Sequence, residues 1–231
     1  MKTLGLIGGM SWESTAIYYR LLNEIVRERR GGLHSAKLLL WSFDFAEIAE
    51  RQHAGDWEGA GALLVEAALM LEEGGAQGLV ICTNTMHKLA DEVQAAVSVP
   101  LIHIADATGR AVVEAGAKRP ALLATRFTME QDFYKGRLAG SYGLQPVVPD
   151  KAGRDMVHGV IYDELCQGVV KPESHAAFVE EVGRMRRDDN VDGVIMGCTE
   201  ITMLIGQGDF DIPVFDTTRI HAEAAVDFAL S

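Results

Sequence analysis

The sequence predicts an α/β protein built on parallel β-sheet, and three observations support this prediction. First, apolar segments alternate with longer amphipathic segments along the 231-residue chain. Second, the apolar segments are continuous, which is typical of strands buried on both faces by helices. Third, the same order of segments occurs twice. A chain of this length is long enough for one large domain or two small ones.

The expected elements follow one another in a regular order. Strands are predicted at residues 3–9, 36–44, 77–82, 100–104, 120–125, 144–148, 192–198 and 212–216. Helices are predicted at residues 12–30, 57–73, 87–97, 108–116, 129–143, 155–168, 173–188 and 220–230. The first helix opens near Ser11 and stops at Gly31 and Gly32, and the second is closed by Gly74 and Gly75.

An internal repeat is visible in the motifs. The segment "GAQGLVICTN" resembles "NVDGVIMGCTE", and "VPLIHIADATGRAV" resembles "IPVFDTTRIHAEAAV". Glu13 and Glu130 also fall at matching places, 117 residues apart. The repeat predicts two α/β subdomains, Rossmann-like or flavodoxin-like, which are related by a pseudo-twofold axis. We expect the first to comprise residues 1–106 with 214–231, and the second residues 107–213.

Two of the three cysteines end predicted strands. Cys82 and Cys198 are each followed by threonine, and they lie 116 residues apart at equivalent points of the repeat. Open α/β sheets bind ligands at the carboxyl ends of their strands, so both thiols should face the cleft between the subdomains. A helix opens after each thiol, and its free N–H groups can lower a thiol pKa. Cys166, inside a predicted helix, is interpreted as a small hydrophobic residue.

The bulk composition disfavours several classes of protein. A net charge of −12 disfavours nucleic-acid binding, which needs clustered lysine and arginine. No apolar run approaches the roughly 18 residues that span a bilayer, and no signal peptide is recognised, so we expect a cytoplasmic protein with no membrane partner. An odd number of cysteines argues against a disulfide framework, and no spacing matches a zinc site.

Opposed thiols suit a reaction that moves a proton between two faces of a carbon. One thiolate would remove a proton from one face of a stereocentre, and the opposite thiol would protonate the other face. A single base could only return the proton to the face it came from, unless the substrate turned over.

Six motifs resemble those of the aspartate/glutamate racemase family, the two-cysteine amino-acid racemases that work without pyridoxal phosphate. They are "GLIGGMSWEST", "CTNTMHK", "HIADAT", "TMEQDFY", "GCTEI" and "VFDTTRIHAEAAV", and they span nearly the whole chain in the expected order. The match is closest to enterobacterial members. The resemblance implies Cys82 and Cys198 as the two bases, an active site between two α/β subdomains, no cofactor and a homodimer. No metal is expected, because the histidines do not fall at zinc-finger spacing.

Ten further residues are expected to bind the amino-acid substrate. The first strand-to-helix turn offers Met10 and Ser11, and its glycines let backbone N–H groups approach a ligand. Donors that suit an α-carboxylate or a developing enediolate follow each cysteine. Glu200 is expected to hold the substrate ammonium or to tune Cys198. The full set is Met10, Ser11, Gln52, Thr83, Asn84, Thr85, Thr125, Lys171, Thr199 and Glu200.

Several of these residues also have simpler structural interpretations. Asn84 or Thr85 could cap a helix, and Glu200 could be a surface carboxylate at a helix start. The resemblance places Gln52 and Lys171 where relatives vary with substrate, and Lys171 would pair with the side-chain carboxylate of an acidic substrate. Either residue could instead face solvent. His87 is interpreted as structural, or as an N–H donor, rather than as a base.

Alternative functions remain open at the level of the sequence. The nearest are sister activities, such as a hydantoin racemase or a maleate isomerase. A non-catalytic module that binds small molecules would not need both thiols. A redox or metal-binding thiol protein would need the thiols within about 2 Å of each other as a disulfide, or a third ligand nearby.

Overall fold

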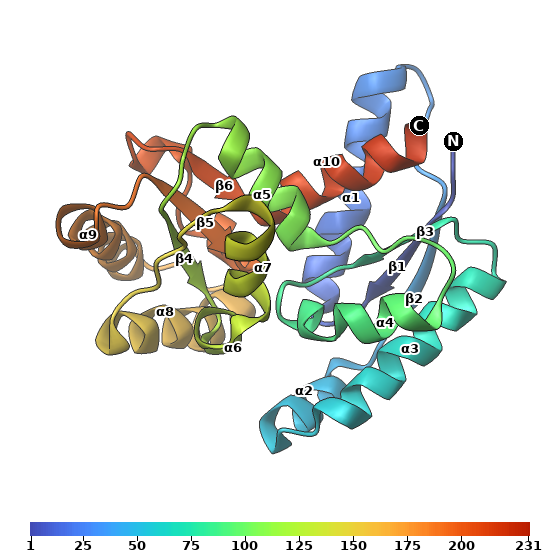
Figure 1. Ribbon diagram of the computed structural model, residues 1–231, viewed down its shortest axis with the longest axis horizontal. Helices are drawn as coiled ribbons and strands as arrows, with labels where there is room; N and C mark the ends of the chain where they lie inside the picture. Colours follow the sequence, from blue (N-terminus) through green and yellow to red (C-terminus); the bar gives the residue numbers. More distant parts are fainter. The chain divides into compact units, whose positions relative to one another are not determined.

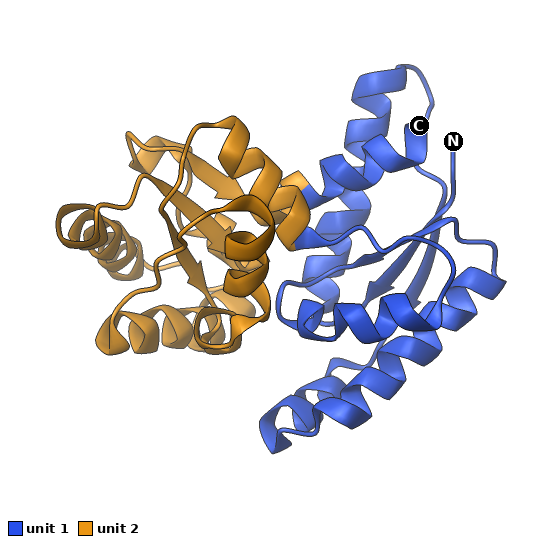
Figure 2. Ribbon diagram, in the orientation of Figure 1, with its two compact units in different colours: residues 1–104, 221–231 blue, residues 105–220 orange.

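The computed structural model describes residues 1–231, which form two compact units (Figure 2). Unit 1 comprises Met1–Ile104 and His221–Ser231, and unit 2 comprises Ala105–Ile220. Each unit contains a three-stranded parallel sheet, so the predicted α/β class with parallel sheets is confirmed.

Unit 1 has the strand order β2-β1-β3. Its strands are β1 (Leu4–Gly8), β2 (Leu38–Ser42) and β3 (Gly78–Ile81). Its helices are α1 (Trp12–Arg30), α2 (Phe45–Ala54), α3 (Trp57–Glu73), α4 (Ala90–Ala96) and the 3-10 helix η1 (Thr85–Leu89). Figure 1 shows the sheet of this unit between α1 and α10 on one side and α3 and α4 on the other.

The alternation of side chains along β3 explains why both faces of this sheet are covered. Leu79 and Ile81 belong to the apolar cluster that includes residues of α3 and α4. Val80 and Cys82 belong to the opposite cluster, which includes residues of α1 and α10. Burying each such aliphatic side chain contributes about 1.5–3 kcal/mol. The same alternation directs the Cys82 side chain toward the α1 face.

Unit 2 has the strand order β4-β5-β6. Its strands are β4 (Pro120–Ala124), β5 (Gly193–Gly197) and β6 (Val214–Asp216). Its helices are α6 (Arg126–Glu130), α7 (Asp132–Tyr142), α8 (Lys151–Asp163), α9 (Pro172–Asp189), η2 (Leu165–Gln167), η3 (Thr199–Met203) and η4 (Gln207–Asp209). Two helices begin where the chain passes between the units, α5 (Ile104–Glu114) and α10 (Thr217–Leu230).

Isolated β-bridges extend the two sheets in a matching way. In unit 1 Leu101 pairs with Leu79 of β3, and in unit 2 Val147 pairs with Ala121 of β4. With the bridges included, the order is β2, β1, β3 and Leu101 in unit 1, and Val147, β4, β5 and β6 in unit 2. The two units therefore have the same topology, as the internal repeat in the sequence suggests.

Two predicted strands, residues 100–104 and 144–148, are wrong in extent because each is reduced to one of these bridges. Proline has no N–H to donate to a ladder, and Pro100 and Pro146 each stand directly before the bridging residue. In the first case the chain also turns into α5 at Ile104.

Several helices also differ from the prediction. The helix expected at 155–168 ends at Asp163 and is followed by η2, and the first turn of the one expected at 87–97 belongs to η1. The helix expected at 129–143 is split, because Gln131 is extended between α6 and α7. Helix α2 is not among the predicted helices. It begins after Asp44, whose side chain accepts a hydrogen bond from the backbone N–H of Ala46. Its starting signal is the acidic N-cap with Glu47 three residues later.

The last helix of each repeat packs in the unit formed by the other repeat. Most of α10 belongs to unit 1, and nearly all of α5 belongs to unit 2. The buried Tyr18 of α1 donates its hydroxyl to Nδ1 of His221 in α10, at 2.8 Å. In unit 2 the buried Tyr134 of α7 bonds Thr108 of α5 at 3.2 Å. Tyr18 and Tyr134 lie 116 residues apart, the same offset as the two cysteines. Each unit thus completes its core with the helix that follows the other repeat.

Burial of His221 makes the stability of unit 1 dependent on pH. Burial lowers the pKa of His221 to about 4 from its ordinary 6.5, because the charged ring would lose water. The unfolded chain therefore binds more protons than the folded chain between these values, and stability falls as the pH drops. We expect the free energy of unfolding to lose about 2 kcal/mol from this group between pH 7 and pH 5.

Urea unfolding at the two pH values checks this expectation. The control is His221→Gln, whose amide can donate to Ile102 and accept from Tyr18 as the ring does. The difference between pH 7 and pH 5 should shrink by about 2 kcal/mol in this variant. An unchanged difference would show that His221 does not cause the loss.

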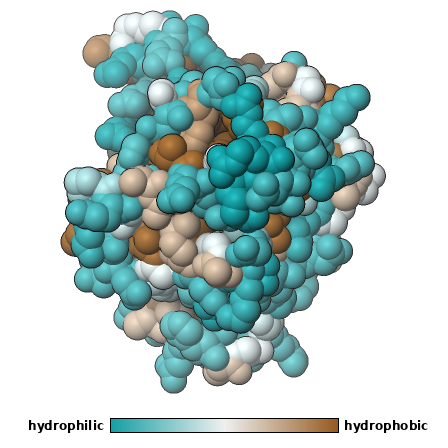
Figure 3. Space-filling model, turned by 90° about the vertical axis from the view of Figure 1, so that its left-hand side faces the viewer, coloured by the Kyte–Doolittle hydropathy of each residue, from teal (hydrophilic) through white to brown (hydrophobic).

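The surface of one face is mostly polar. The face shown in Figure 3 is predominantly hydrophilic, with hydrophobic atoms only in separate small areas. None of the helices combines the length and the apolar character that crossing a membrane requires.

Candidate active site

Cys82 lies directly after β3, at the carboxyl end of the unit 1 sheet. Its N–H continues the ladder to β1 by donating to the carbonyl of Ile7 at 2.9 Å. The residue is 1 % exposed. The sulfur makes one long contact, 3.9 Å to the carbonyl oxygen of Val80. Burial without a charged partner raises the pKa of the Cys82 thiol well above its ordinary value.

The predicted residues of unit 1 gather around this end of the sheet. Because β1 and β3 are parallel neighbours, the turn after β1 and the segment after β3 meet at one edge. Ser11 caps α1 there by accepting from the N–H of Ser14 at 3.3 Å. Gln52 of α2 reaches the same segment, since its amide donates to Sδ of Met86 at 2.9 Å. The set comprises Met10, Ser11, Gln52, Cys82, Thr83, Asn84 and Thr85.

Glycine is required in the turn that follows β1. Gly9 has a φ of +81°, and a Cβ atom at this position would overlap the backbone of Phe43. Its N–H donates to the Thr15 hydroxyl at 2.8 Å. The turn is therefore packed tightly between α1 and the segment after β2, which supports Met10 and Ser11.

Cys198 occupies the equivalent position in unit 2, directly after β5. It is half-buried, and its thiol donates to Oε2 of Glu200 at 2.9 Å. Burial is the largest cause that raises the pKa of this thiol, followed by the charge of Glu200 and the hydrogen bond that its carboxylate accepts. The carboxylate of Glu200 therefore lies in direct contact with the thiol whose pKa it was expected to influence.

The predicted lowering of the thiol pKa values is wrong for both cysteines. The elements that follow are short 3-10 helices, η1 and η3, rather than α-helices with an aligned dipole at the thiol. Burial then dominates at Cys82, and burial with a neighbouring carboxylate dominates at Cys198. Both thiols are thus held protonated near neutral pH until another charge enters the site.

The other predicted residues of unit 2 occupy two places. Thr125 follows β4, the parallel neighbour of β5, and its hydroxyl lies 3.4 Å from that of Thr128. Thr199 lies beside Cys198 and accepts a hydrogen bond from Thr218 at 3.3 Å. Lys171 instead precedes α9, and its ammonium pairs with Glu164 at 3.1 Å. The unit thus brings Thr125 and Thr199 to the sheet edge with Cys198.

Two residues near Cys198 have surroundings that the sequence did not predict. Cys166 is exposed in η2, so its interpretation as buried hydrophobic filling is wrong. Burial raises the pKa of Tyr162 to about 12, and the acidic groups of Cys198, Cys166 and Glu200 act in the same direction. The phenol of Tyr162 therefore stays neutral beside these groups. No periodic signal in α8 marks this tyrosine.

Three side chains hold the backbone near the two thiols, and sequence reasoning missed two of them, Ser14 and Thr217. Ser14 of α1 donates its hydroxyl to the carbonyl oxygen of Cys82 at 2.9 Å. His87 bonds the carbonyl oxygen of Thr83 through Nδ1 at 2.8 Å. In unit 2 the Thr217 hydroxyl donates to the carbonyl oxygen of Met196 at 2.8 Å. Ser14 and Thr217 act on segments far away in the sequence, which a local pattern does not reveal.

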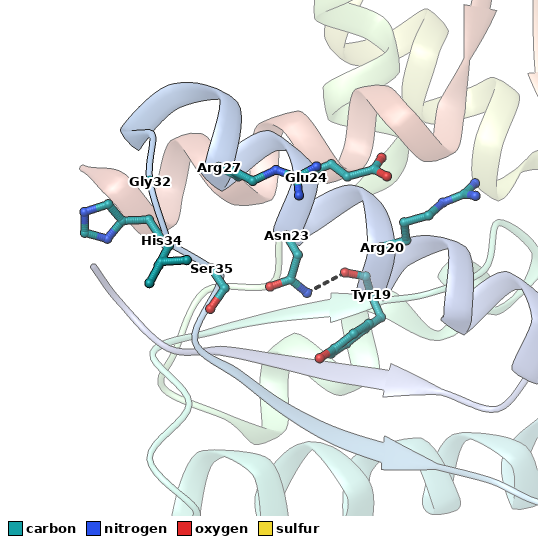
Figure 4. A pocket seen from close by; sticks show the side chains of 9 residues that line it. Tyr19, Arg20, Asn23, Glu24, Arg27, Gly32, His34 and Ser35 are labelled. Atoms are coloured by element: carbon teal, nitrogen blue, oxygen red, sulfur yellow. Dashed lines mark hydrogen bonds between the residues drawn. The ribbon is translucent and has the colours of Figure 1, made fainter.

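A pocket of about 530 Å³ lies elsewhere in unit 1, along the outer face of α1 (Figure 4). In it Asn23 donates to the backbone carbonyl of Tyr19 within the same helix. None of the predicted site residues lines this pocket, so it does not contribute to the candidate site. Its lining consists of Tyr19, Arg20, Asn23, Glu24, Arg27, Gly32, Leu33, His34 and Ser35.

Comparison with known proteins shows which family the chain belongs to. The family model for Asp/Glu/hydantoin racemases matches residues 7–225. A crystal structure from Yersinia pestis, of a protein inferred to be an Asp/Glu racemase, is 50 % identical with a TM-score of 0.95, and the match covers 100 % of both chains. An aspartate racemase homologue from Pyrococcus horikoshii is 35 % identical with a TM-score of 0.89, again over 100 % of both chains.

A curated relative extends the comparison to an enzyme with a wider substrate range. The broad specificity amino-acid racemase RacX of Bacillus subtilis is 20 % identical over 99 % of this chain and 98 % of its own length. The match to the family model covers nearly the whole chain, and the likeness to the first two structures extends from end to end. The chain belongs to the Asp/Glu/hydantoin racemase family and is an isomerase of that family.

Proposed function

We propose that this enzyme racemises amino acids without a cofactor, with Cys82 and Cys198 as its two bases. The observation that carries the proposal is the equivalence of the two thiols. Each follows the strand next to the first strand of its repeat, at the carboxyl end of a parallel sheet, and each precedes a threonine and a 3-10 helix. Thiols at equivalent ends of two similar units suit a reaction that treats two mirror-image substrates alike.

The proton balance of the reaction requires opposite protonation of the two thiols. One enantiomer loses its α-proton to the thiolate of one cysteine, and the carbanion receives a proton from the thiol of the other. The enzyme then holds the thiolate on the second cysteine, ready for the reverse reaction. The mechanism requires that Cys82 of unit 1 and Cys198 of unit 2 reach opposite faces of one α-carbon.

The substrate supplies the charge that makes a thiolate accessible. Both thiols have raised pKa values without substrate. The α-ammonium of an amino acid would stabilise a nearby thiolate and lower its pKa, because opposite charges interact strongly where water is excluded. Thr83, Asn84, Thr85 and Thr199 would donate hydrogen bonds to the carboxylate as charge develops on it. Activation of the base would then depend on substrate binding.

The substrate class is proposed from the relatives and from the charged residues. We assign aspartate, glutamate or a broader set of amino acids, because relatives include an aspartate racemase homologue and a broad specificity racemase. Lys171 would accept the side-chain carboxylate of an acidic substrate, with Gln52 contributing from unit 1. The enzyme would act in the cytoplasm as a homodimer.

A panel of L-amino acids tests the proposal. The purified, reduced enzyme is incubated with each amino acid, and chiral chromatography measures the D-enantiomer. We expect D-aspartate, D-glutamate or several D-amino acids to accumulate toward a 1:1 mixture. No turnover of any amino acid, with turnover of a hydantoin or of maleate, would replace the proposal by a sister activity. Binding without turnover of any substrate would favour a binding module.

Glu200→Gln is expected to lower the pKa of the Cys198 thiol. The variant removes the negative charge 2.9 Å from the sulfur but keeps an oxygen that can accept the S–H hydrogen bond. The measurement is the pH dependence of iodoacetamide alkylation at Cys198, followed by peptide mass spectrometry, with Cys82 alkylation as the control. The midpoint for Cys198 should move to lower pH while that for Cys82 stays. An unmoved or higher midpoint for Cys198 would contradict a tuning role.

A further inference from the structure

The two thiols are held in different ways. The sulfur of Cys198 has a carboxylate at 2.9 Å, which fixes the direction of its S–H bond. The sulfur of Cys82 has only the 3.9 Å contact to the Val80 carbonyl, and a contact of this length constrains direction weakly. The aim of the Cys82 thiol must therefore be set through its backbone and through the packing of the α1 face.

Buried side chains hold the backbone on both sides of the peptide bond between Cys82 and Thr83. The Ser14 hydroxyl donates to the Cys82 carbonyl oxygen at 2.9 Å. The His87 ring bonds the Thr83 carbonyl oxygen at 2.8 Å. The Cys82 N–H is occupied by the Ile7 carbonyl. Ser14 and His87 are 3 % and 2 % exposed, so water does not replace these contacts easily.

The hydrogen bonds of His87 determine which ring nitrogen carries the proton. The backbone N–H of Ile104 points to Nε2 at 3.2 Å, and an N–H can only donate. Nε2 is therefore the acceptor, and Nδ1–H donates to the Thr83 carbonyl. Both nitrogens of the neutral ring are used, so His87 has no free site from which to act as a base. This agrees with its interpretation as an N–H donor.

The same ring joins the thiol segment to the place where the chain leaves unit 1. Ile104 is the last residue of unit 1 before Ala105 begins unit 2. The His87 ring also lies against two other buried histidines, His103 at 4.7 Å and His221 at 5.4 Å between ring centroids. His221 in turn donates from Nε2 to the carbonyl of Ile102. The hydrogen bonds at both ring nitrogens, to Thr83 and Ile104, fix the orientation of the ring and give the Thr83 carbonyl a rigid partner.

We propose that Ser14 and His87 are positioning residues that aim the Cys82 thiol through its backbone. The inference rests on the proposed two-thiol mechanism and deepens it. Releasing either carbonyl would let the peptide units after Cys82 rotate and would misplace the sulfur. A misplacement of about 1 Å costs a proton transfer up to about 100-fold in rate. Thr83 lies in the same segment and is proposed to bind the substrate carboxylate, so KM should rise as well. The isotope effect for one enantiomer is therefore the readout that separates aiming of the thiol from substrate binding.

The test compares variants of matched size. His87→Leu removes the donor with little change in volume, whereas His87→Asn keeps an N–H donor at the position of Nδ1. Ser14→Ala removes only the hydroxyl. His221→Gln is the matched control, because it alters a neighbouring buried histidine that does not bond the Cys82 segment. Circular dichroism and thermal unfolding establish the folded fraction of each variant, and rates are expressed per folded molecule.

The readout is the deuterium isotope effect on kcat/KM, measured with α-¹H and α-²H forms of both enantiomers. Cys82→Ser identifies the enantiomer that Cys82 deprotonates, since its isotope effect rises when a poorer base makes that step slower. We expect His87→Leu to lower kcat by roughly 10- to 100-fold and to raise the isotope effect for that enantiomer only. Ser14→Ala should act in the same direction with a smaller loss. His87→Asn should recover most of the rate, and His221→Gln should leave both isotope effects unchanged.

Four results would overturn the inference. Equal rises for both enantiomers in His87→Leu would indicate a general loss of structure. A loss no larger than that of His221→Gln, or no recovery in His87→Asn, would show that the donor at Nδ1 does not aim the thiol. If Cys82→Ser alters neither isotope effect, the two-thiol mechanism itself fails, and the positioning role fails with it.

Discussion

Replacing Cys82 or Cys198 by alanine is expected to lower kcat by roughly 10²- to 10⁴-fold, because each variant loses one of the two proton-transfer groups. The loss should be the same from either enantiomer, since each direction uses one thiol as base and the other as acid. Steady-state racemisation assays in both directions measure it. Each substitution replaces a small side chain by a slightly smaller one, so circular dichroism should show an intact fold.

Cys166→Ala is the matched control for these variants. Cys166 is the third cysteine, and it is exposed in η2. Its replacement should leave kcat within about two-fold, because no proton transfer is assigned to it. Near-normal turnover in Cys82→Ala or Cys198→Ala would contradict the two-base mechanism. A loss in Cys166→Ala as large as in those variants would show that the assignment of the thiols is wrong.

Lys171→Ala should raise the KM for aspartate or glutamate by roughly 10- to 150-fold. The estimate follows from about 1.5–3 kcal/mol for a charge-assisted hydrogen bond to the side-chain carboxylate of the substrate. Without substrate, Lys171 is half-exposed and pairs with Glu164 at 3.1 Å. An acidic substrate would share or replace this partner. Kinetics on glutamate and on a neutral amino acid separate side-chain binding from other effects.

Lys151→Ala provides a matched control for this variant. Lys151 is another exposed lysine of unit 2, and it is paired with Asp155 at 2.6 Å. Its removal should change KM for neither substrate. Equal effects of Lys171→Ala on glutamate and on the neutral amino acid would argue against a role in binding the side-chain carboxylate. No effect on either would place Lys171 outside the substrate site.

Much of the fold could be predicted because buried parallel strands have a strong signature. The runs that become β1, β3, β4 and β5 are buried along their whole length, so they read as continuous apolar segments. The positions of Cys82 and Cys198 at strand ends followed from the same runs. The family motifs then identified the family, which the comparisons confirm.

The remainder depends on contacts that a single segment does not contain. A bridge of one residue, as at Leu101, cannot be told from a short strand by its apolar pattern. The raised pKa of Cys82 comes from burial by helices that are distant in the sequence. The packing of α10 in unit 1 and of α5 in unit 2 likewise depends on contacts between distant segments. Ser14 meets Cys82 across 68 positions in the chain, so its role needed the structure.

Two-base racemisation is tested most directly by the origin of the α-hydrogen in the product. The reduced enzyme is incubated in D₂O with the L-amino acid that it racemises fastest, and the reaction is stopped at low conversion. The enantiomers are separated, and mass spectrometry measures deuterium in each. The D-enantiomer should carry close to one α-deuterium, delivered by the opposite thiol, while the remaining L-enantiomer stays largely unlabelled. Retention of the original α-hydrogen in the D-enantiomer would contradict the two-base mechanism, since it would mean that a single base returns the proton it removed.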